Sequence, residues 1–138
     1  MVNELWINLP VKDVIRSKTF FKNIGFSFNE EMCRGSESAC MLVGDKKIVV
    51  MLFAESILES FAQNPLTDTS KSTEVLLSFD AATREDVDAM AKKVEEAGGD
   101  VFAPPADNQG WMYGFAFKDP DGHRWNQLYM DRSKRPTV

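Results

Sequence analysis

The stretch FKDPDGHRWNQLYM, residues 117–130, has the pattern of a strand end, a tight turn and a second strand. DPDG is typical of a turn, because Asp, Pro and Gly supply the backbone angles and local hydrogen bonds that a chain reversal needs. Side chains alternate along a strand, so Asn126 and Trp125 lie on opposite faces, and Trp125 is predicted to pack against a helix. The sequence therefore predicts a hairpin that presents an amide, not a carboxylate, on the face away from that helix.

The residues before this hairpin complete one module. TEVLLSFD, residues 73–80, predicts a strand, and Thr83 is placed to cap a helix whose apolar residues recur at helical spacing until Gly98-Gly99. DVFAPP and GFAFKD predict two further strands before the last one. The second half is thus expected to run strand, helix, strand, strand, strand over residues 73–131.

The first half repeats this order. ELWINLPV predicts a strand, Asp13 an N-cap and Gly25 the end of a helix, and FSFNEE, ACMLV and KIVVMLF predict three more strands. We expect a first module over residues 4–53 and a polar connector with a short helix over residues 54–72. The fold class is then α+β, with two β-α-β-β-β modules whose curled mixed sheets form a cleft.

Length and composition restrict the class of protein. The 138 residues suit a single domain, and a net charge of −5 with scattered Lys and Arg argues against a nucleic-acid partner. No segment has the pattern of a signal peptide or a membrane span, so we expect a cytoplasmic protein with no membrane partner. Cys33, Cys40 and the single His123 cannot assemble a zinc finger. A cleft between paired modules predicts a small-molecule ligand.

Three stretches occur in the order that paired modules require: LPVKDVIRSKTFFKNIGF, TEVLLSFDA and WMYGFAFKDPDGHRWNQLYM. Together they resemble the vicinal oxygen chelate superfamily of glyoxalase-like, bleomycin-resistance-like and extradiol dioxygenase-like proteins. Within it, the sequence is most similar to proteins described as predicted lactoylglutathione lyases. The resemblance extends from Glu4 to Asp131 and implies the paired-module fold. Homodimers are common among such proteins, so a homodimer is expected.

The resemblance also implies four positions at which metal-dependent members bind a divalent ion. They fall on Trp6, on the apolar strand around Met51, on Glu74 and on Asn126. An indole is not a metal ligand, the apolar strand offers no hard donor on either face, and an amide oxygen is a weak ligand. The sequence therefore predicts no tightly bound metal cofactor. A divalent ion stays the alternative, in a lactoylglutathione lyase-type isomerase or a dioxygenase.

Binding without chemistry is the first of two metal-free hypotheses. A cleft lined by Trp6, Trp111, Tyr113 and Phe115, with Glu74 as the lone charge, would hold a flat or cationic small molecule. The plainer interpretation is that these aromatic residues belong to the core. Glycines flank the segment around Trp111, which would permit a mobile cover, but a strand beginning there is at least as consistent with the pattern.

The second metal-free hypothesis is an enzyme that uses Glu74 as a general base. Apolar walls such as Trp6 and Met51 would raise its pKa, while Asn8 and Asn126 would donate hydrogen bonds to an oxyanion. Glu74 stands near the start of its strand after a polar connector, so a side chain that points into water is the alternative. The sequence does not decide whether the protein is an enzyme.

Overall fold

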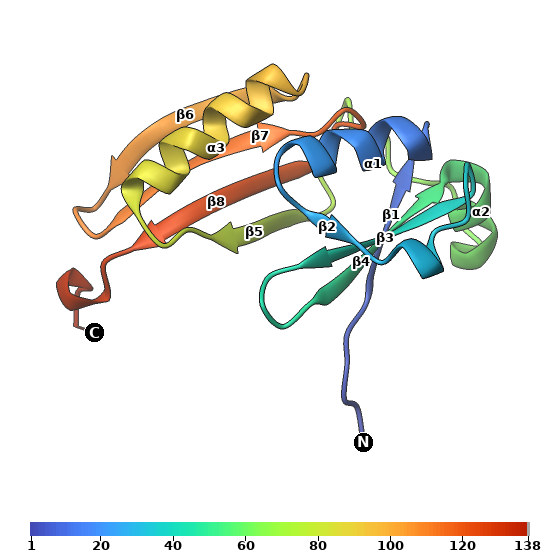
Figure 1. Cartoon of the computed structure of the whole chain (residues 1–138), viewed down its shortest axis with the longest axis horizontal. Coiled ribbons are helices and arrows are strands. Elements are labelled where there is room, and N and C mark those ends of the chain that lie inside the picture. Colours follow the sequence, from blue (N-terminus) through green and yellow to red (C-terminus); the bar gives the residue numbers. More distant parts are fainter. Residues whose placement is uncertain (138) are drawn as a thin grey trace. The chain divides into compact units, whose positions relative to one another are not determined.

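The fold is taken from a computed structural model that describes residues 1–137. Within this range the chain forms two four-stranded mixed sheets and three α-helices, which is the predicted α+β class (Figure 1). It divides into two compact units, Met1–Asp68 and the residues from Thr69 onward. None of the helices described is long and apolar enough to cross a membrane.

The first unit is built on four strands in the order β1-β4-β3-β2. β1 runs parallel to β4, and the other pairs are antiparallel. The elements are β1 (Ile7–Val11), α1 (Val14–Asn23), β2 (Ser27–Phe28), the 3-10 helix η1 (Glu30–Met32), β3 (Ser38–Val43), β4 (Ile48–Ala54) and α2 (Glu55–Ala62). The predicted order is confirmed, with two shorter strands: β1 begins at Ile7 and not at Glu4, and β2 has two residues because the chain turns into η1.

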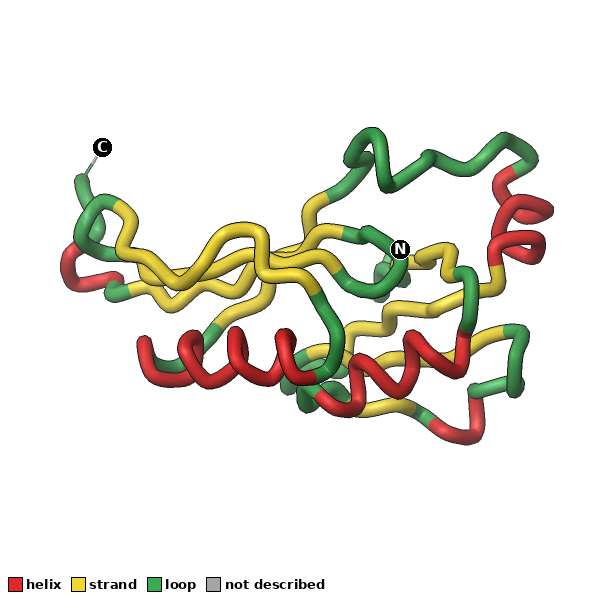
Figure 2. Tube along the Cα trace, turned by 90° about the horizontal axis from the view of Figure 1, so that it is seen from above, coloured by secondary structure: helices red, strands yellow, loops and turns green. Residues whose placement is uncertain are grey.

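Helix α1 covers one face of this sheet. Figure 2 shows each of the two longer helices lying along its own sheet. Asp13 caps it as predicted, since the Asp13 carboxylate accepts a hydrogen bond from the Arg16 backbone N–H at 3.0 Å. Phe20 and Phe21 are buried against the strands. The chain leaves the helix through Gly25, whose φ of 106° favours glycine.

The second unit repeats the arrangement, with strands in the order β5-β8-β7-β6. Its elements are β5 (Leu76–Asp80), α3 (Arg84–Glu96), β6 (Asp100–Asn108), β7 (Met112–Lys118), β8 (Arg124–Met130) and the 3-10 helix η2 (Arg132–Lys134). Thr83 caps α3, accepting a hydrogen bond from the Asp86 backbone N–H at 3.0 Å. Trp125 is buried on the face that α3 covers, which confirms its predicted packing.

Strand β6 is longer than the sequence predicts. It continues through Pro104 and Pro105 to Asn108, and its register against β7 shifts on both sides of Ala103. Proline lacks the N–H that a ladder needs, but β6 is an edge strand with only one partner. The two shifts place more residues on β6 than on the facing part of β7, which is the geometry of a β-bulge.

Gly114 is the position of β7 at which no larger residue fits. A Cβ atom built there would lie 2.5 Å from the Gln127 carbonyl oxygen and 2.7 Å from Leu128 Cδ2. We expect Gly114→Ala to lower the free energy of unfolding by about 1–3 kcal/mol, because the β7–β8 pair would have to separate. Urea denaturation would measure this. The matched control is Ala116→Gly, with an expected loss of about 1 kcal/mol or less. An unchanged unfolding midpoint for Gly114→Ala would contradict the prediction.

Candidate functional site

In the first unit, Asn8 and Met51 are brought together on neighbouring strands. Asn8 of β1 is paired with Met51 of β4, and Met51 is paired with Cys40 of β3. Residues that are directly opposite in a sheet share a face, so the three side chains form a row opposite α1. Asn8 is exposed, Met51 half-buried and Cys40 buried. Burial raises the pKa of the Cys40 thiol, which favours its neutral form.

Trp6 does not belong to this row. It precedes β1 and is 63% exposed, in the segment that runs away from the sheet towards the N-terminus (Figure 1). The sequence placed it on the first strand beside Asn8. The ordered strand is shorter, because Ile7 is the first residue paired with β4.

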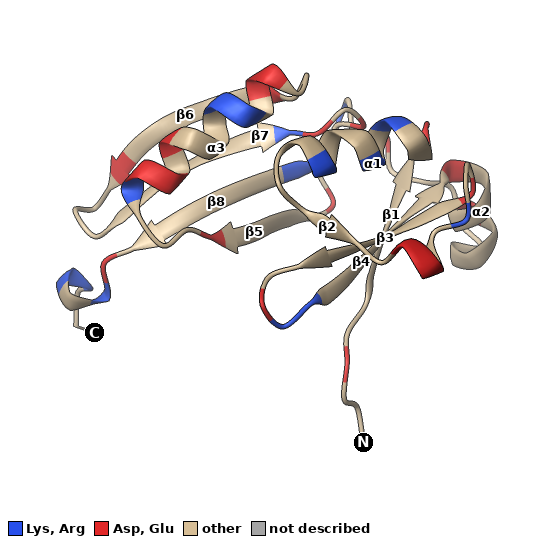
Figure 3. Cartoon of the chain, viewed as in Figure 1, with Lys and Arg blue, Asp and Glu red and all other residues tan. Residues whose placement is uncertain are grey.

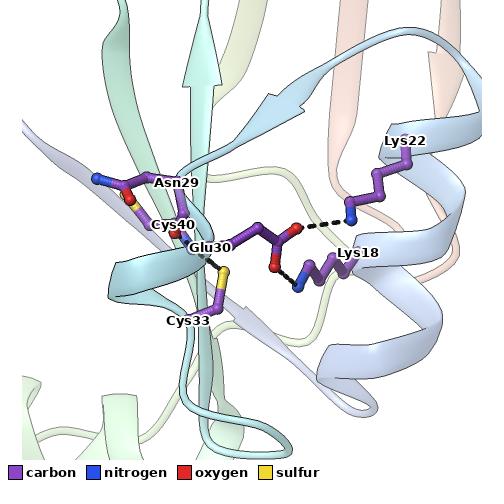
Figure 4. A network of polar contacts seen from close by, with 6 residues as sticks. All are labelled: Lys18, Lys22, Asn29, Glu30, Cys33 and Cys40. Carbon is purple, nitrogen blue, oxygen red and sulfur yellow. Dashed lines mark hydrogen bonds and ion pairs between the residues drawn. The ribbon is translucent and has the colours of Figure 1, made fainter.

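A second polar cluster of this unit lies between α1 and η1 (Figure 4). Lys18 and Lys22 hold the Glu30 carboxylate at 2.6 and 2.7 Å, and these hydrogen bonds lower the pKa of Glu30. Cys33 Sγ lies 3.3 Å from the Asn29 carbonyl oxygen, and it accepts a hydrogen bond from the Cys40 backbone N–H at 3.5 Å. The fold also brings Lys18 of α1 close to Cys33, although the two residues are far apart in the sequence.

In the second unit, Asn126 lies on the face of the sheet opposite α3. It is paired with Ala116 of β7 and Ser78 of β5, while the alternate residues of β8, Trp125 and Gln127, are buried on the α3 side. Asn126 Oδ1 is buried and has no hydrogen-bond partner within residues 1–137. Buried polar atoms normally have a hydrogen-bond partner, so this acceptor is an exception among the described residues.

Gln127, the second amide of the opening stretch, has a structural role. Its Nε2 donates a hydrogen bond of 3.1 Å to the Asp80 carbonyl oxygen and so ties β8 to the end of β5. Its Oε1 is buried among the α3-side residues, without a partner among the described residues.

Two basic residues share the face of Asn126. Lys118, at the end of β7, is paired in register with Arg124, at the start of β8, and both strand ends carry the colour of basic residues in Figure 3. Lys118 forms an ion pair with Asp100 at 3.2 Å. The Arg124 guanidinium lies over the Phe102 ring, 4.4 Å from its centroid, which is a cation–π contact.

The β-bulge explains how Phe102 reaches Arg124. Val101 is paired with Phe117 and Ala103 with Ala116, so Phe102 is the extra residue of β6 between two successive residues of β7. Because Ala116 is small, the Phe102 ring can extend across β7 towards β8. Strand alternation in RWN would have placed Arg124 beside Asn126. The contact between Arg124 and Phe102 could not be predicted from the sequence, because the contact depends on the bulge.

Tyr113 and Phe115 lie on the opposite face from Asn126, which differs from the predicted aromatic wall. Phe115 is buried and stacks on Phe117, with 5.5 Å between ring centroids. The Tyr113 hydroxyl donates a hydrogen bond of 2.6 Å to Asp88 of α3, which raises the pKa of Tyr113. The cause is the register of the hairpin. Tyr113 is paired with Tyr129, and Tyr129 is an odd number of residues from Asn126 on β8, so the two lie on opposite faces.

An arginine of α3 lies against the same tyrosines. The Arg84 guanidinium is 5.0 Å from the Tyr113 ring centroid and 5.9 Å from that of Tyr129, and it binds the Asp107 carboxylate at 2.9 Å. This hydrogen bond lowers the pKa of Asp107, which also accepts the Gly110 backbone N–H. The cluster joins the first turn of α3 to the β6–β7 hairpin.

Trp111 and Glu74 lie outside the strands of this sheet. Trp111 precedes β7, its carbonyl oxygen accepts a hydrogen bond of 2.7 Å from Asp131, and its Nε1 is buried without a partner in the described part of the chain. Glu74 precedes β5 and is exposed. The apolar enclosure that a general base would need is therefore not seen around Glu74.

The residues at the four positions that the resemblance assigns to a metal do not fit a divalent ion. They offer an exposed indole at Trp6, a thioether at Met51, one exposed carboxylate at Glu74 and an amide at Asn126. Calcium and magnesium require several oxygen ligands, and zinc requires several imidazole, thiolate or carboxylate ligands. Within residues 1–137, no group of three or more His, Cys, Asp or Glu is arranged to hold a metal ion.

The DPDG turn contains a buried carboxylate that sequence reasoning treated as part of a turn only. Asp119 Oδ1 accepts the backbone N–H groups of Asp121 at 2.9 Å and His123 at 3.1 Å, and its Oδ2 accepts Trp125 Nε1 at 3.1 Å. Burial raises the pKa of Asp119 from 3.8 to about 6, although the charge of His123 and the Trp125 hydrogen bond act in the other direction. This network holds the start of β8, and therefore Arg124, in place.

Comparison with known proteins agrees with the fold and with the paired sheets. A hypothetical protein, SA1046 from S. aureus, is 34% identical; the match covers 94% of each chain with a TM-score of 0.81. A glyoxalase/bleomycin resistance protein/dioxygenase family enzyme from Burkholderia phytofirmans PsJN is 21% identical, covering 91% of this chain and 96% of that one with a TM-score of 0.77.

A fosfomycin resistance protein, FosX from Listeria monocytogenes, is 19% identical and covers 99% of this chain and 100% of that one, with a TM-score of 0.71. This structure and the Burkholderia enzyme are too distant in sequence to show more than a common fold. No curated protein matches the sequence. A family profile described as Glyoxalase/Bleomycin resistance protein/Dioxygenase superfamily matches residues 5–126. Because that range covers most of the 138 residues, the chain belongs to the Glyoxalase/Bleomycin resistance protein/Dioxygenase superfamily.

Proposed function

We propose that this protein binds a small organic molecule on the face of its second sheet opposite α3, and that it does so without a tightly held divalent ion. The observation that carries the proposal is Asn126, whose Oδ1 is buried without a partner among residues 1–137. An amide in that setting accepts a hydrogen bond from a ligand or from a bound water. A homodimeric assembly and a cytoplasmic location stay predictions from the sequence.

The surroundings of Asn126 suit an organic ligand. Ala116 and Ser78, its two neighbours in register, have small side chains. Leu76 and Phe102 add exposed apolar surface on the same unit, and Arg124 adds a charge. Binding sites commonly combine apolar surface with a few polar groups that orient the ligand. Binding alone, without conversion of the ligand, is the form of the proposal that requires no further group.

A blocking substitution tests the location. Chelator-treated, isotope-labelled protein is screened by NMR against a library of small organic compounds. The compounds that bind are then titrated into Ala116→Leu, which adds bulk beside Asn126. We expect Ala116→Leu to abolish their binding while the remaining spectrum is preserved. Ala89→Leu, on the exposed surface of α3, is the matched control and should bind normally. Compounds that bind Ala116→Leu unchanged would contradict the proposal.

The metal part of the proposal has its own test. We expect protein purified without a tag or chelator to contain no stoichiometric metal, and calorimetric titration with nickel, cobalt, manganese and zinc to show no tight binding. The reason is the donor set, which has one exposed carboxylate among four positions. Stoichiometric metal that disappears in Glu74→Gln would contradict the prediction. It would favour the metal-dependent isomerase or dioxygenase alternative instead.

A further inference from the structure

We infer that the ligand of this site is an organic anion, and that Arg124 and Asn126 bind its carboxylate group. The inference rests on the proposed function and adds the chemical class of the ligand. Its basis is the position of an unpaired guanidinium beside an unpartnered amide on one face of β8.

Arg124 is a cation without an acidic partner. Within residues 1–137 it forms no ion pair, whereas Lys118, its neighbour in register, is paired with Asp100. Arg124 is half-buried, so its charge is less well solvated than that of an exposed arginine. A guanidinium in a cation–π contact still carries N–H groups along its planar edge, which can donate two parallel hydrogen bonds. A carboxylate is the complementary acceptor.

Asn126 is correctly placed to complete such a site. It lies two residues after Arg124 on the same strand and the same face, which corresponds to roughly 7 Å along the strand. The Arg124 side chain is long enough to span that separation. Since the oxygen and nitrogen of an amide are exchanged by a simple flip, Asn126 can also donate an N–H to the same carboxylate. Its lack of an internal partner leaves both orientations open.

The carboxylates of this face do not cancel the charge of Arg124. Asp100 is occupied by Lys118. Asp80 is exposed and lies four residues along β5 from Leu76, the partner of Arg124, which is roughly 13 Å. Water screens exposed charges at that distance efficiently. Glu74 is exposed and precedes the strand. An anion at Arg124 would therefore meet one half-buried positive charge, while the nearest carboxylate in register, Asp100, is already paired with Lys118.

Matched probes test the class of ligand. Benzoate and its neutral analogue benzamide are titrated into labelled protein, and the Arg124 Nε–H and Asn126 side-chain amide signals are followed. We expect saturable binding of benzoate with shifts of both signals, and binding of benzamide weaker by about tenfold or more, because a hydrogen bond to a charged group is the stronger kind.

Variants separate the role of Arg124 from general charge effects. Arg124→Met should weaken benzoate about tenfold or more and leave benzamide unchanged. Arg124→Lys, which keeps the charge but loses the planar fork, should recover only part of the affinity. Arg132→Met, at an exposed arginine of η2 in the same unit, is the control and should bind benzoate normally.

Two failures have different meanings. If benzamide binds beside Asn126 as well as benzoate does, or if Arg124→Met binds benzoate normally, the anionic class is wrong and the proposed function stands. If neither these probes nor any compound of the small-molecule library binds beside Asn126, the proposed function is wrong as well.

Discussion

Asp119→Ala is expected to lower the free energy of unfolding by about 3 kcal/mol or more. The substitution removes the acceptor of three donors, the backbone N–H groups of Asp121 and His123 and the indole N–H of Trp125. Each donor left buried without a partner costs about 1–3 kcal/mol, and the turn that begins β8 would lose its internal hydrogen bonds. Urea denaturation at pH 7 measures the change. Asp45→Ala, in the exposed turn between β3 and β4, is the control and should change stability by about 0.5 kcal/mol or less.

The same carboxyl group predicts how stability depends on pH. Its pKa in the folded protein is raised to about 6, above the ordinary 3.8 that applies when the chain unfolds. Between these values the unfolded chain has released the proton and the folded protein has kept it. The part of the stability that comes from protonation of Asp119 is therefore fully present below about pH 4 and is lost as the pH rises through about 6, whereas the three hydrogen bonds to its carboxyl group remain at pH 7. The difference between the two pKa values corresponds to about 3 kcal/mol.

Asp119→Asn isolates this contribution. The amide cannot titrate. The free energy of unfolding of the wild type minus that of Asp119→Asn should therefore decrease as the pH rises from 4 to 6. Asp45→Asn should follow the wild type throughout. A difference that increases with pH would mean that the three hydrogen bonds to the Asp119 carboxylate outweigh its burial. The pKa of Asp119 would then lie below its ordinary value.

Phe117→Ala is the second large effect, with an expected loss of about 3–5 kcal/mol. The Phe117 ring is fully buried and lies between two aromatic rings. Its centroid is 5.5 Å from that of Phe115 and 6.5 Å from that of Trp125, in stacked arrangements with interplanar angles of 19° and 8°. Truncation would leave a cavity that these rigid rings cannot fill.

Graded variants distinguish a cavity from a general loss of fold. Phe117→Leu should cost about 1–2 kcal/mol, because it keeps most of the volume. Phe61→Ala removes a ring that is 63% exposed on α2 and should cost about 1 kcal/mol or less. Unfolding midpoints in urea would measure all three. A loss for Phe117→Ala no larger than that for Phe61→Ala would show that the second sheet repacks around the missing ring.

The sequence predicted the order of elements because that order depends on local signals. Asp13 and Thr83 begin their helices as caps, and glycine follows the end of each. Hydrophobic spacing then identified the buried sides of both helices. Resemblance to a known superfamily followed from the order of these elements and the DPDG hairpin, and the family match over residues 5–126 confirms it. These features require contacts between residues close in the chain, which a sequence displays directly.

The candidate site was predicted only in part, for reasons that concern register. Alternation along β8 correctly separated Asn126 from Trp125, because both belong to one strand. The face on which Tyr113 lies depends on how β7 pairs with β8. Tyr113 is opposite Tyr129, an odd number of residues from Asn126, and so it lies on the α3 side. Strand ends were also uncertain from sequence, so Trp6 was assigned to a strand that begins after it.

Amino-acid sequence alone determined the class of fold and the boundaries of the two longer helices. The lack of strong metal ligands at Trp6, Met51 and Asn126 stays a prediction from the sequence. Tertiary structure decided which polar groups meet. The bulge of β6 brings Phe102 to Arg124, and the burial of Asp119 depends on the packing of Trp125 and the turn. The physical reason is that pairing register and burial are set by residues far apart in the chain, while caps, turns and alternation are set by neighbours.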